Sequence, residues 1–357
     1  MDRENTEQRK SQITTPFFME LLGVALLLLL SLPSPTSSCT EQEKISLLRF
    51  LEGLSQDSGL TTSWRNGTNC CMWKGIVCDA DDAVKEISLA SMGLEGSISS
   101  SLGNLTRLMN LNLSCNSLSG DLPAELFLSR SMIFFDVSFN NLNGDLHKLP
   151  STTGRPMQVI DISSNLFTGK IPSTTLESME NLAGHNELTG TLPDELYNAT
   201  SLEHLSFPNN RLQGALNPKH IIKLNNLVIL DLAENALNGK IPDSIGQLKR
   251  LEELHLEYNS MSGELPSTIS KCSKLRTIIL WGNSFHGDLN NVNFSTLSNL
   301  KILDFMLNKF TGKIPESLYF CNNLIAGILG IAGERKDGEA GGVDEDDEGN
   351  EKSLLAR

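Results

Sequence analysis

The chain has 357 residues, a formal net charge of −14 and 39% hydrophobic residues, with few aromatic side chains. This length accommodates either two ordinary domains or one elongated array of repeats. Because the charge is acidic and no basic cluster stands out, nucleic acid is excluded as the expected partner.

Residues 1–38 are predicted to form a signal peptide. A short apolar run covers residues 21–32, and small residues follow it from Ser34 to Ser38, which is the pattern of a signal core and its cleavage zone. An uncleaved anchor is the alternative. Since about 20 apolar residues are needed to span a bilayer, we expect cleavage, export and no membrane span in the mature chain.

Four of the seven cysteines lie within the first 40 residues after the expected cleavage point: Cys39, Cys70, Cys71 and Cys78. This density predicts a disulfide-bonded N-terminal cap over residues 39–82 in an oxidising compartment. Adjacent cysteines do not pair easily, so Cys39–Cys70 and Cys71–Cys78 is the simplest pairing, although the spacing leaves other pairings open. A metal site is disfavoured because no histidine lies nearby. Five N-x-Ser/Thr sequons predict glycans: Asn66, Asn104, Asn112, Asn198 and Asn293.

The cap is expected to contain one helix directly after Cys39. Apolar residues recur there at helical spacing, namely Ile45, Leu48, Phe50, Leu51 and Leu54. Trp64 and Trp73 are expected to cover the first coil of the array that follows.

Residues 83–326 repeat the pattern L-x-L-x-x-N-x-L-x-G-x-I/L-P about ten times, for example at 111–123 and 230–242. The marker asparagines are Asn116, Asn140, Asn165, Asn186, Asn210, Asn235, Asn259, Asn283 and Asn308, and Met92 occupies the slot in the first copy. The pattern predicts an α/β repeat solenoid whose L-x-L segments stack into one parallel sheet. An α-solenoid is disfavoured because Gly and Pro recur in the copies.

The chemistry of the repeat is structural. The marker amide can bond backbone groups of its own coil and of a neighbouring coil, which predicts a ladder of asparagines that satisfies the polar groups of the turns. The glycine permits a positive φ, and the proline fixes φ where the chain leaves the repeat.

Two places break the period. The step from Asn165 to Asn186 is 21 residues, where the other steps are 24 or 25. Counting back from Asn186 puts Asn181 and Ala183 in inward slots and Leu182 outward, so we expect a poorly packed or bulged coil. Residues 327–357 lack repeat residues and are predicted to be an acidic disordered tail, which leaves the array without a visible terminal cap.

The cap sequence around Ser63–Trp64 and residues 70–78, with repeats ending in G-x-I-P, resembles the plant-specific class of leucine-rich repeats. The runs at 93–123 and 240–267 are similar to plant receptor-like proteins and kinases of the tyrosine-sulfated glycopeptide and phytosulfokine receptor group. The resemblance implies a superhelix with a concave parallel sheet. It also implies recognition of a secreted peptide or a co-receptor ectodomain, in hormone or defence signalling.

Such receptors usually continue into further repeats, an island loop, a membrane helix and often a kinase domain. We find none of these in the sequence. The chain is therefore expected to be a truncated ectodomain released into the apoplast, whereas family members reside at the plasma membrane.

Outward strand positions form the concave face of a solenoid, and function is expected there. The candidate ligand-binding residues are His255, Glu257, Tyr258, Ile279, Trp281, Asp304 and Met306. Exposed aromatic side chains beside acids are common in recognition patches. The alternative is that these large side chains only pack laterally between neighbouring strands.

Catalytic signatures are missing from the sequence. The six histidines are scattered through separate coils, and no zinc-protease, phosphate-loop or kinase motif occurs, so we expect no enzyme activity, cofactor or metal. The alternative function is that of a secreted inhibitor of a microbial cell-wall-degrading enzyme, similar to polygalacturonase-inhibiting proteins, with a pathogen protein as partner. Those inhibitors end in a cysteine-bearing cap, and this chain has no cysteine after Cys321.

Overall fold

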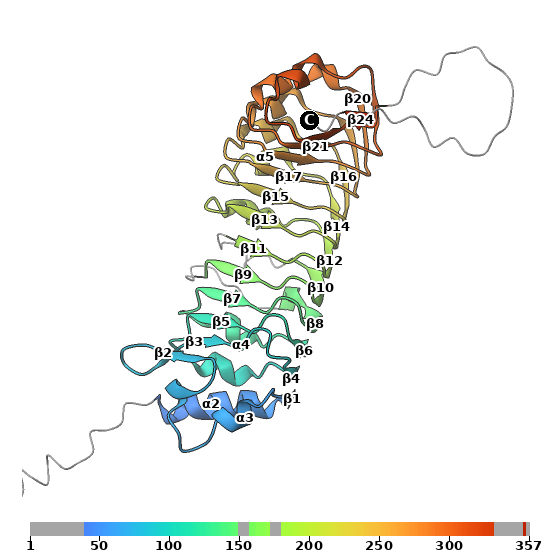
Figure 1. Cartoon of the computed structure of the whole chain (residues 1–357). Helices are drawn as coiled ribbons and strands as arrows, with labels where there is room; N and C mark the ends of the chain where they lie inside the picture. The colour runs from blue at the N-terminus through green and yellow to red at the C-terminus, as the bar shows by residue number, and fades with distance from the viewer. Residues whose placement is uncertain (1–38, 149–156, 172–179, 332–352, 355–357) are drawn as a thin grey trace, which may run out of the picture. The chain divides into compact units, whose positions relative to one another are not determined.

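The computed structural model describes residues 39–148, 157–171, 180–331 and 353–354. The predicted signal peptide and most of the predicted tail lie outside these residues. From the cap onward the chain forms a stack of coils in which each repeat contributes one turn (Figure 1). The predicted repeat solenoid is confirmed.

The L-x-L segments form a sheet of 13 strands, called the concave sheet below. Its strands are β2 (Ile76–Cys78), β3 (Val84–Ser88), β5 (Asn110–Asn112), β7 (Phe134–Asp136), β9 (Val159–Asp161), β11 (Glu180–Leu182), β13 (His204–Ser206), β15 (Ile229–Asp231), β17 (Glu253–His255), β19 (Thr277–Ile279), β21 (Ile302–Asp304), β23 (Ala326–Ile328) and β24 (Ser353–Leu354). Strands β3 to β23 are parallel and β2 and β24 pair antiparallel at the two ends. The leucines of each segment are buried between coils, as Leu254 and Leu256 show.

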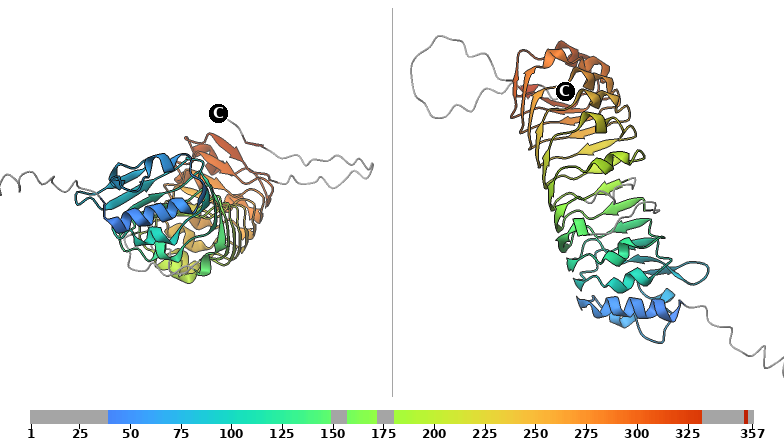
Figure 2. Two further views of the ribbon diagram at one scale, coloured as in Figure 1. Left: turned by 90° about the horizontal axis from the view of Figure 1, so that it is seen from below. Right: turned by 180° about the vertical axis from the view of Figure 1, so that it is seen from behind.

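A second sheet of 11 strands runs along the side of the stack (Figure 2). Its strands are β1 (Leu54–Gln56), β4 (Glu95–Ser97), β6 (Ser117–Asp121), β8 (Asn141–Asp145), β10 (Leu166–Lys170), β12 (Glu187–Gly190), β14 (Arg211–Gly214), β16 (Ala236–Gly239), β18 (Ser260–Glu264), β20 (Ser284–Asp288) and β22 (Lys309–Thr311). The sequence analysis expected only one sheet. The segment after each marker asparagine is also extended, and stacking aligns these segments for pairing with the next coil.

Short helices complete the coils. They are α2 (Glu41–Glu52), α3 (Leu60–Ser63), α4 (Ala124–Phe127) and α5 (Pro218–Ile221), with the 3-10 helices η1 (Cys70–Met72), η2 (Ser100–Asn104), η3 (Leu146–Lys148), η4 (Asp194–Asn198), η5 (Asp243–Gln247), η6 (Ser267–Lys271), η7 (Leu289–Asn291), η8 (Phe294–Thr296) and η9 (Glu316–Phe320). The repeat prolines Pro193, Pro242 and Pro266 stand at the N-caps of η4, η5 and η6. There the fixed φ of proline suits the start of a helical turn.

The predicted asparagine ladder is confirmed. Asn210 is typical: its Oδ1 accepts from Leu188 N–H of the preceding coil at 3.0 Å, and its Nδ2 donates to the carbonyls of Ala183 at 3.0 Å and Phe207 at 3.3 Å. Every marker from Asn116 to Asn308 has such bonds to two coils. The glycine of the repeat has the expected positive φ, as at Gly120 (84°).

The short coil keeps its register. Asn181 of β11 pairs with Ile160 of β9 and with Leu205 of β13, so it occupies the inward slot that counting back from the marker assigned to it. The ladder through β11 runs without a bulge, which removes that alternative. The packing of the β11 side chains lies outside what the structure describes.

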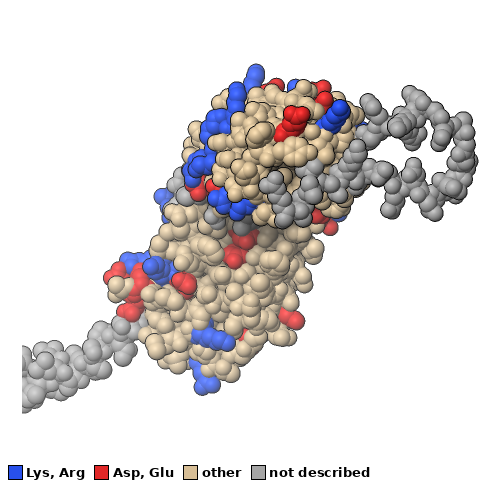
Figure 3. All heavy atoms as spheres, turned by 45° about the horizontal axis from the view of Figure 1, so that its top comes forward, with Lys and Arg blue, Asp and Glu red and all other residues tan. Residues whose placement is uncertain are grey.

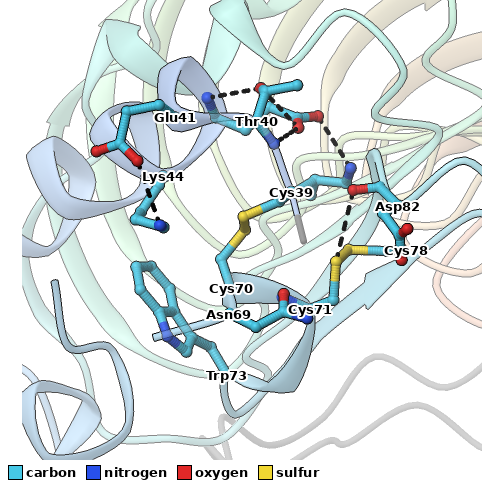
Figure 4. Close-up of a disulfide and its surroundings, with 12 residues drawn as sticks. Cys39, Thr40, Glu41, Lys44, Asn69, Cys70, Cys71, Trp73, Cys78 and Asp82 are labelled. Carbon is cyan, nitrogen blue, oxygen red and sulfur yellow. Dashed lines mark hydrogen bonds and ion pairs between the residues drawn. A yellow bond between two sulfur atoms is a disulfide. The ribbon is translucent and has the colours of Figure 1, made fainter. Parts of the chain in front are cut away.

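The N-terminal cap is built on helix α2 and two disulfides (Figure 4). Cys39 is bonded to Cys70 and Cys71 to Cys78, the simplest of the pairings that the sequence allows. Thr40 and the Glu43 side chain close a capping box at the start of α2. Glu43 also accepts from Val84 N–H at 2.9 Å, and this bond ties the helix to β3.

The buried face of α2 differs from the predicted one. The helix buries Leu47 and Phe50 completely, whereas Ile45 is 36% exposed. The face turns toward Trp64, whose ring lies 6.1 Å from Phe50 and 5.5 Å from Trp73. Both tryptophans are buried, so the aromatic stack of the cap selects which side of the helix faces inward.

The last coil continues beyond the expected end of the repeats. Strand β23 pairs with β21, and Leu329 and Ile331 behind it are buried. The first residues of the predicted tail, 327–331, therefore belong to this coil.

On the face shown in Figure 3, Lys and Arg side chains gather over the C-terminal coils, while the middle of the stack is mostly uncharged. The distribution of charged side chains on this face does not by itself indicate a binding site.

Candidate ligand-binding surface

The concave sheet presents its side chains in columns because its strands are in register. We call the last residue of each strand the strand-end column, the residue two places later the exit column, and the next residue the turn column. Asp136, Asp161, Asp231, His255, Ile279 and Asp304 all stand in the strand-end column. Residues on neighbouring coils of one column lie about 5 Å apart.

In the N-terminal coils the polar groups of these columns satisfy one another. Asp136 Oδ1 accepts from the backbone N–H and the hydroxyl of Ser138 at 2.9 and 2.7 Å. Asp161 makes the same pair of bonds with Ser163 at 2.9 and 2.6 Å, and Asn112 makes them with Ser114. Each coil thus closes its own hydrogen bonds, with an Asn or Asp in the strand-end column and a Ser in the exit column.

In the C-terminal coils the exit-column serine is replaced. The equivalent positions hold Ala233, Glu257, Trp281 and Met306. Within their own coils Asp231 and Asp304 accept only from a backbone N–H, at 3.2 and 3.0 Å. The acceptors of these coils are therefore less satisfied from within the coil than those of the N-terminal coils.

The structure brings all seven candidate residues together on the coils of β17, β19 and β21. His255, Glu257, Ile279, Trp281, Asp304 and Met306 are half-buried, and Tyr258 is 46% exposed. The rings of Tyr258 and Trp281 lie 4.4 Å apart at an interplanar angle of 54°. The lateral packing expected as the alternative does occur, and it leaves Tyr258 accessible.

Tyr258 and Leu307 belong to the turn column and not to the strand. Both have a left-handed backbone, with φ of 49° and 51°, which non-glycine residues seldom adopt. The sequence predicts an outward strand slot for Tyr258. The turn that ends each L-x-L segment exposes these side chains at the edge of the sheet, and Leu307 is 55% exposed.

His255 lies among carboxylates. Its Nε2 is 3.3 Å from Glu253 and its Nδ1 is 3.8 Å from Glu257. Burial acts to lower the pKa of His255, but Glu257, Asp231 and Glu253 together outweigh it and hold the pKa above its ordinary value. Burial, with the nearby Glu257 charge, raises the pKa of the Asp231 carboxyl, which also accepts from the Ser206 hydroxyl at 3.2 Å. Glu253 is not among the residues predicted from the sequence, although its place two residues before His255 puts it on the same face of the strand.

Two polar atoms of this surface are buried without a hydrogen-bond partner: Glu257 Oε2 and Trp281 Nε1. They belong to adjacent coils of the exit column. Leaving such groups unpaired costs free energy, typically about 1–3 kcal/mol each. The adjacent coils of this surface therefore hold one acceptor and one donor that are shielded from solvent and have no partner within the described chain.

The predicted glycosylation sites fall into two groups. Asn66, Asn104, Asn198 and Asn293 are exposed, whereas Asn112 is half-buried on β5 with its side-chain oxygen bonded to Ser114. Within the described part of the chain no three metal-binding side chains come close enough to hold an ion. None of the described helices has the length and hydrophobicity that crossing a bilayer requires.

Comparison with known families identifies the parts of this fold. The leucine rich repeat N-terminal domain matches residues 40–79, and the leucine rich repeat matches residues 107–128, 226–248 and 250–272. The chain is a leucine-rich-repeat protein. Its homologues are plant receptor-like proteins and receptor kinases, phytosulfokine receptors among them.

Two relatives from Arabidopsis thaliana illustrate this likeness. Receptor-like protein 36 is 30% identical over 265 residues, which cover 66% of the chain and 35% of that protein. Phytosulfokine receptor 2 is 41% identical over 96 residues, which cover 26% of the chain and 9% of the receptor. The chain therefore spans about a third or less of the length of these relatives.

Solved structures extend the likeness to the fold. The leucine-rich-repeat ectodomain of the Arabidopsis receptor kinase HAESA, in complex with an N-terminally extended IDA peptide hormone, is 33% identical with a TM-score of 0.69; the match covers 81% of the chain and 49% of that ectodomain. A second HAESA structure, at 30% identity and a TM-score of 0.64 over 80% of the chain and 52% of HAESA, also contains the co-receptor SERK1. The fold is thus one that serves ligand binding in receptors.

Proposed function

We propose that the chain is an extracellular recognition module of a receptor-like protein, which binds a secreted peptide across the concave face of the β15 to β21 coils. The residues proposed to contact the peptide are His255, Glu257, Tyr258, Ile279, Trp281, Asp304 and Met306. The chain itself performs no catalytic step and needs no cofactor under this proposal.

One observation carries the proposal. The serine that closes the polar groups of the N-terminal coils is replaced in the C-terminal coils by Glu257, Trp281 and Met306, and the first two bear buried atoms without partners. Large aromatic side chains in the centre of a half-buried surface are typical of binding hot spots.

The proposal extends to partners and location. The HAESA structures support a peptide hormone and a co-receptor ectodomain as the classes of partner. We propose export through the signal at residues 1–38, release into the apoplast, and glycans on the exposed sequons. A signalling role in growth or defence would follow from the ligand.

Binding of candidate peptide hormones tests the proposal, with titration calorimetry on the full secreted chain. Trp281→Ala is expected to weaken binding at least thirtyfold, about 2 kcal/mol, as for a hot-spot aromatic. Phe139→Ala is the matched control, because Phe139 is a 60% exposed aromatic in the turn column of an N-terminal coil. Equal effects of the two variants would overturn the proposal.

The alternative partner is a pathogen protein, such as a microbial wall-degrading enzyme. The same two variants separate it from the peptide. If a wall-degrading enzyme is bound and inhibited while no peptide binds, the inhibitor function replaces the receptor function.

A further inference from the structure

The proposed binding surface divides into an acidic half and an apolar half. The coils of β15 and β17 contribute Asp231, Glu234, Glu253 and Glu257 to it. The coils of β19 and β21 contribute mainly apolar groups: Ile279, Trp281, Ile302, Met306 and Leu307. Along the stack, the surface therefore changes from acidic to mainly apolar within four coils.

The acidic half has little positive charge of its own. In the columns of these four coils, all of which the structure describes, His255 is the only basic side chain. The nearest arginines, Arg250 and Arg276, precede the strands and pair with Glu203 at 3.0 Å and Glu252 at 3.1 Å. These bonds occupy the two arginines. Within the columns only His255, which lies 3.3 Å from Glu253 and 3.8 Å from Glu257, offsets the negative charge of the acids.

Glu257 and Trp281 lie where the two halves meet. A carboxylate oxygen that is shielded from water and lacks a donor is stabilised by a cationic group, and charge-assisted hydrogen bonds are stronger than neutral ones. The Glu257 carboxylate thus matches a ligand that brings a positive side chain.

The spacing of the two halves sets the spacing within the ligand. Neighbouring strands are about 4.8 Å apart, so the centres of the β15–β17 and β19–β21 pairs are separated by about 10 Å. An extended peptide in the polyproline II conformation rises about 3.1 Å per residue and has three residues per turn. When such a peptide runs along the stack, that distance corresponds to about three residues, and side chains three residues apart lie on the same side of it, whereas in a β-strand they would point to opposite faces.

We infer that the ligand is an extended peptide segment with a Lys or Arg side chain three residues away from a large apolar side chain. The cation pairs with Glu257 and Asp231, and the apolar group packs on Trp281, Ile279 and Met306. This inference rests on the proposed function and adds the chemical class of its ligand.

Short synthetic peptides with blocked ends test the inference, because blocking removes the terminal charges. The series compares Lys-x-x-Trp, in both chain directions, with Glu-x-x-Trp and with adjacent Lys-Trp, in a neutral Gly/Ser/Thr background. Binding to the full chain is measured by calorimetry at low and high salt. We expect Lys-x-x-Trp to bind at least tenfold more tightly than the Glu peptide, with a difference that shrinks in salt.

Variants test whether the acidic half causes the preference for the Lys peptide over the Glu peptide. Glu257→Gln is expected to reduce the Lys-over-Glu preference to less than threefold, whereas Asp161→Asn, in the same columns of an N-terminal coil, leaves it unchanged. Thermal unfolding of Glu257→Gln checks that the variant is folded. If it does not fold, Asp231→Asn with the same readout takes its place.

The outcomes separate the inference from the proposed function. Peptides that bind regardless of charge, but lose binding in Trp281→Ala, overturn the inference and leave the proposed function intact. An equal preference in Glu257→Gln and wild type also overturns the inference. If no peptide in the series and no candidate hormone binds, both fall.

Discussion

Asp136 and Asp231 occupy the same register position on the concave sheet, four coils apart, yet their surroundings differ. Asp136 receives two bonds from Ser138, while Asp231 receives only a backbone N–H from Ala233 in its own coil. The backbone of the two coils is the same. A single replacement in the exit column therefore changes how the strand-end aspartate is hydrogen-bonded, while the leucines behind both coils stay buried.

The largest test of this difference places serine in the exit column of two C-terminal coils. The double variant Glu257→Ser, Trp281→Ser is expected to weaken peptide binding by at least a hundredfold, because it removes both orphaned groups and the central aromatic. Calorimetry on the full chain measures it. Retention of affinity within threefold would show that the exit column is not where the ligand binds.

Lowering the pH is expected to weaken binding of a cationic peptide about tenfold between pH 8 and pH 5. The pKa of His255 is raised above 6.5, so it gains a positive charge early as the pH falls. The pKa of Asp231 is raised above 3.8, so it loses its negative charge earlier than an ordinary aspartate. Both changes reduce the attraction of this part of the surface, which also carries Glu253 and Glu257, for a cation.

The control for this pH effect is His255→Gln, which should remove the step near neutral pH and keep the weaker one at acidic pH. Affinity is measured across the range in matched ionic strength. An affinity that stays constant or rises toward pH 5 would contradict the arrangement of charges around His255.

Ala233→Ser introduces, in one C-terminal coil, the exit-column serine that bonds the strand-end aspartate in the N-terminal coils. The new hydroxyl can donate to Asp231, as that of Ser138 does to Asp136, and would compete with a ligand cation. We expect about threefold weaker binding of Lys-x-x-Trp. Ser138→Ala, the reciprocal change, should leave binding as it is; a loss there of the same size would mean that the N-terminal coils also take part.

The smallest expected effect concerns stability. Ser138 is only 4% exposed, and its hydroxyl donates to the Asp136 carboxylate. Ser138→Ala removes this hydrogen bond and should lower the free energy of unfolding by about 0.5–1 kcal/mol. Urea denaturation followed by circular dichroism measures this. Ala233→Ser should change stability less, and a larger loss there would indicate that the C-terminal coil has no room for the serine.

Much of the fold could be predicted because each repeat encodes its own register. The period of the leucines and the marker asparagines determines which side chains point inward, and it placed Asn181 of the short coil correctly. The asparagine ladder followed from the hydrogen-bonding capacity of one amide. The sequence also gathered the seven candidate residues on neighbouring coils, since equal spacing in the chain becomes adjacency in the stack.

What the sequence by itself determined is thus the stacking of coils and the columns of the concave sheet, because these depend on local period alone. The tertiary structure decided the rest: the second sheet, the buried face of α2, the left-handed turn at Tyr258, and the lack of partners at Glu257 Oε2 and Trp281 Nε1. Each of these depends on which groups a neighbouring coil or the cap brings within reach. Such contacts are set in three dimensions and leave no periodic mark in the chain.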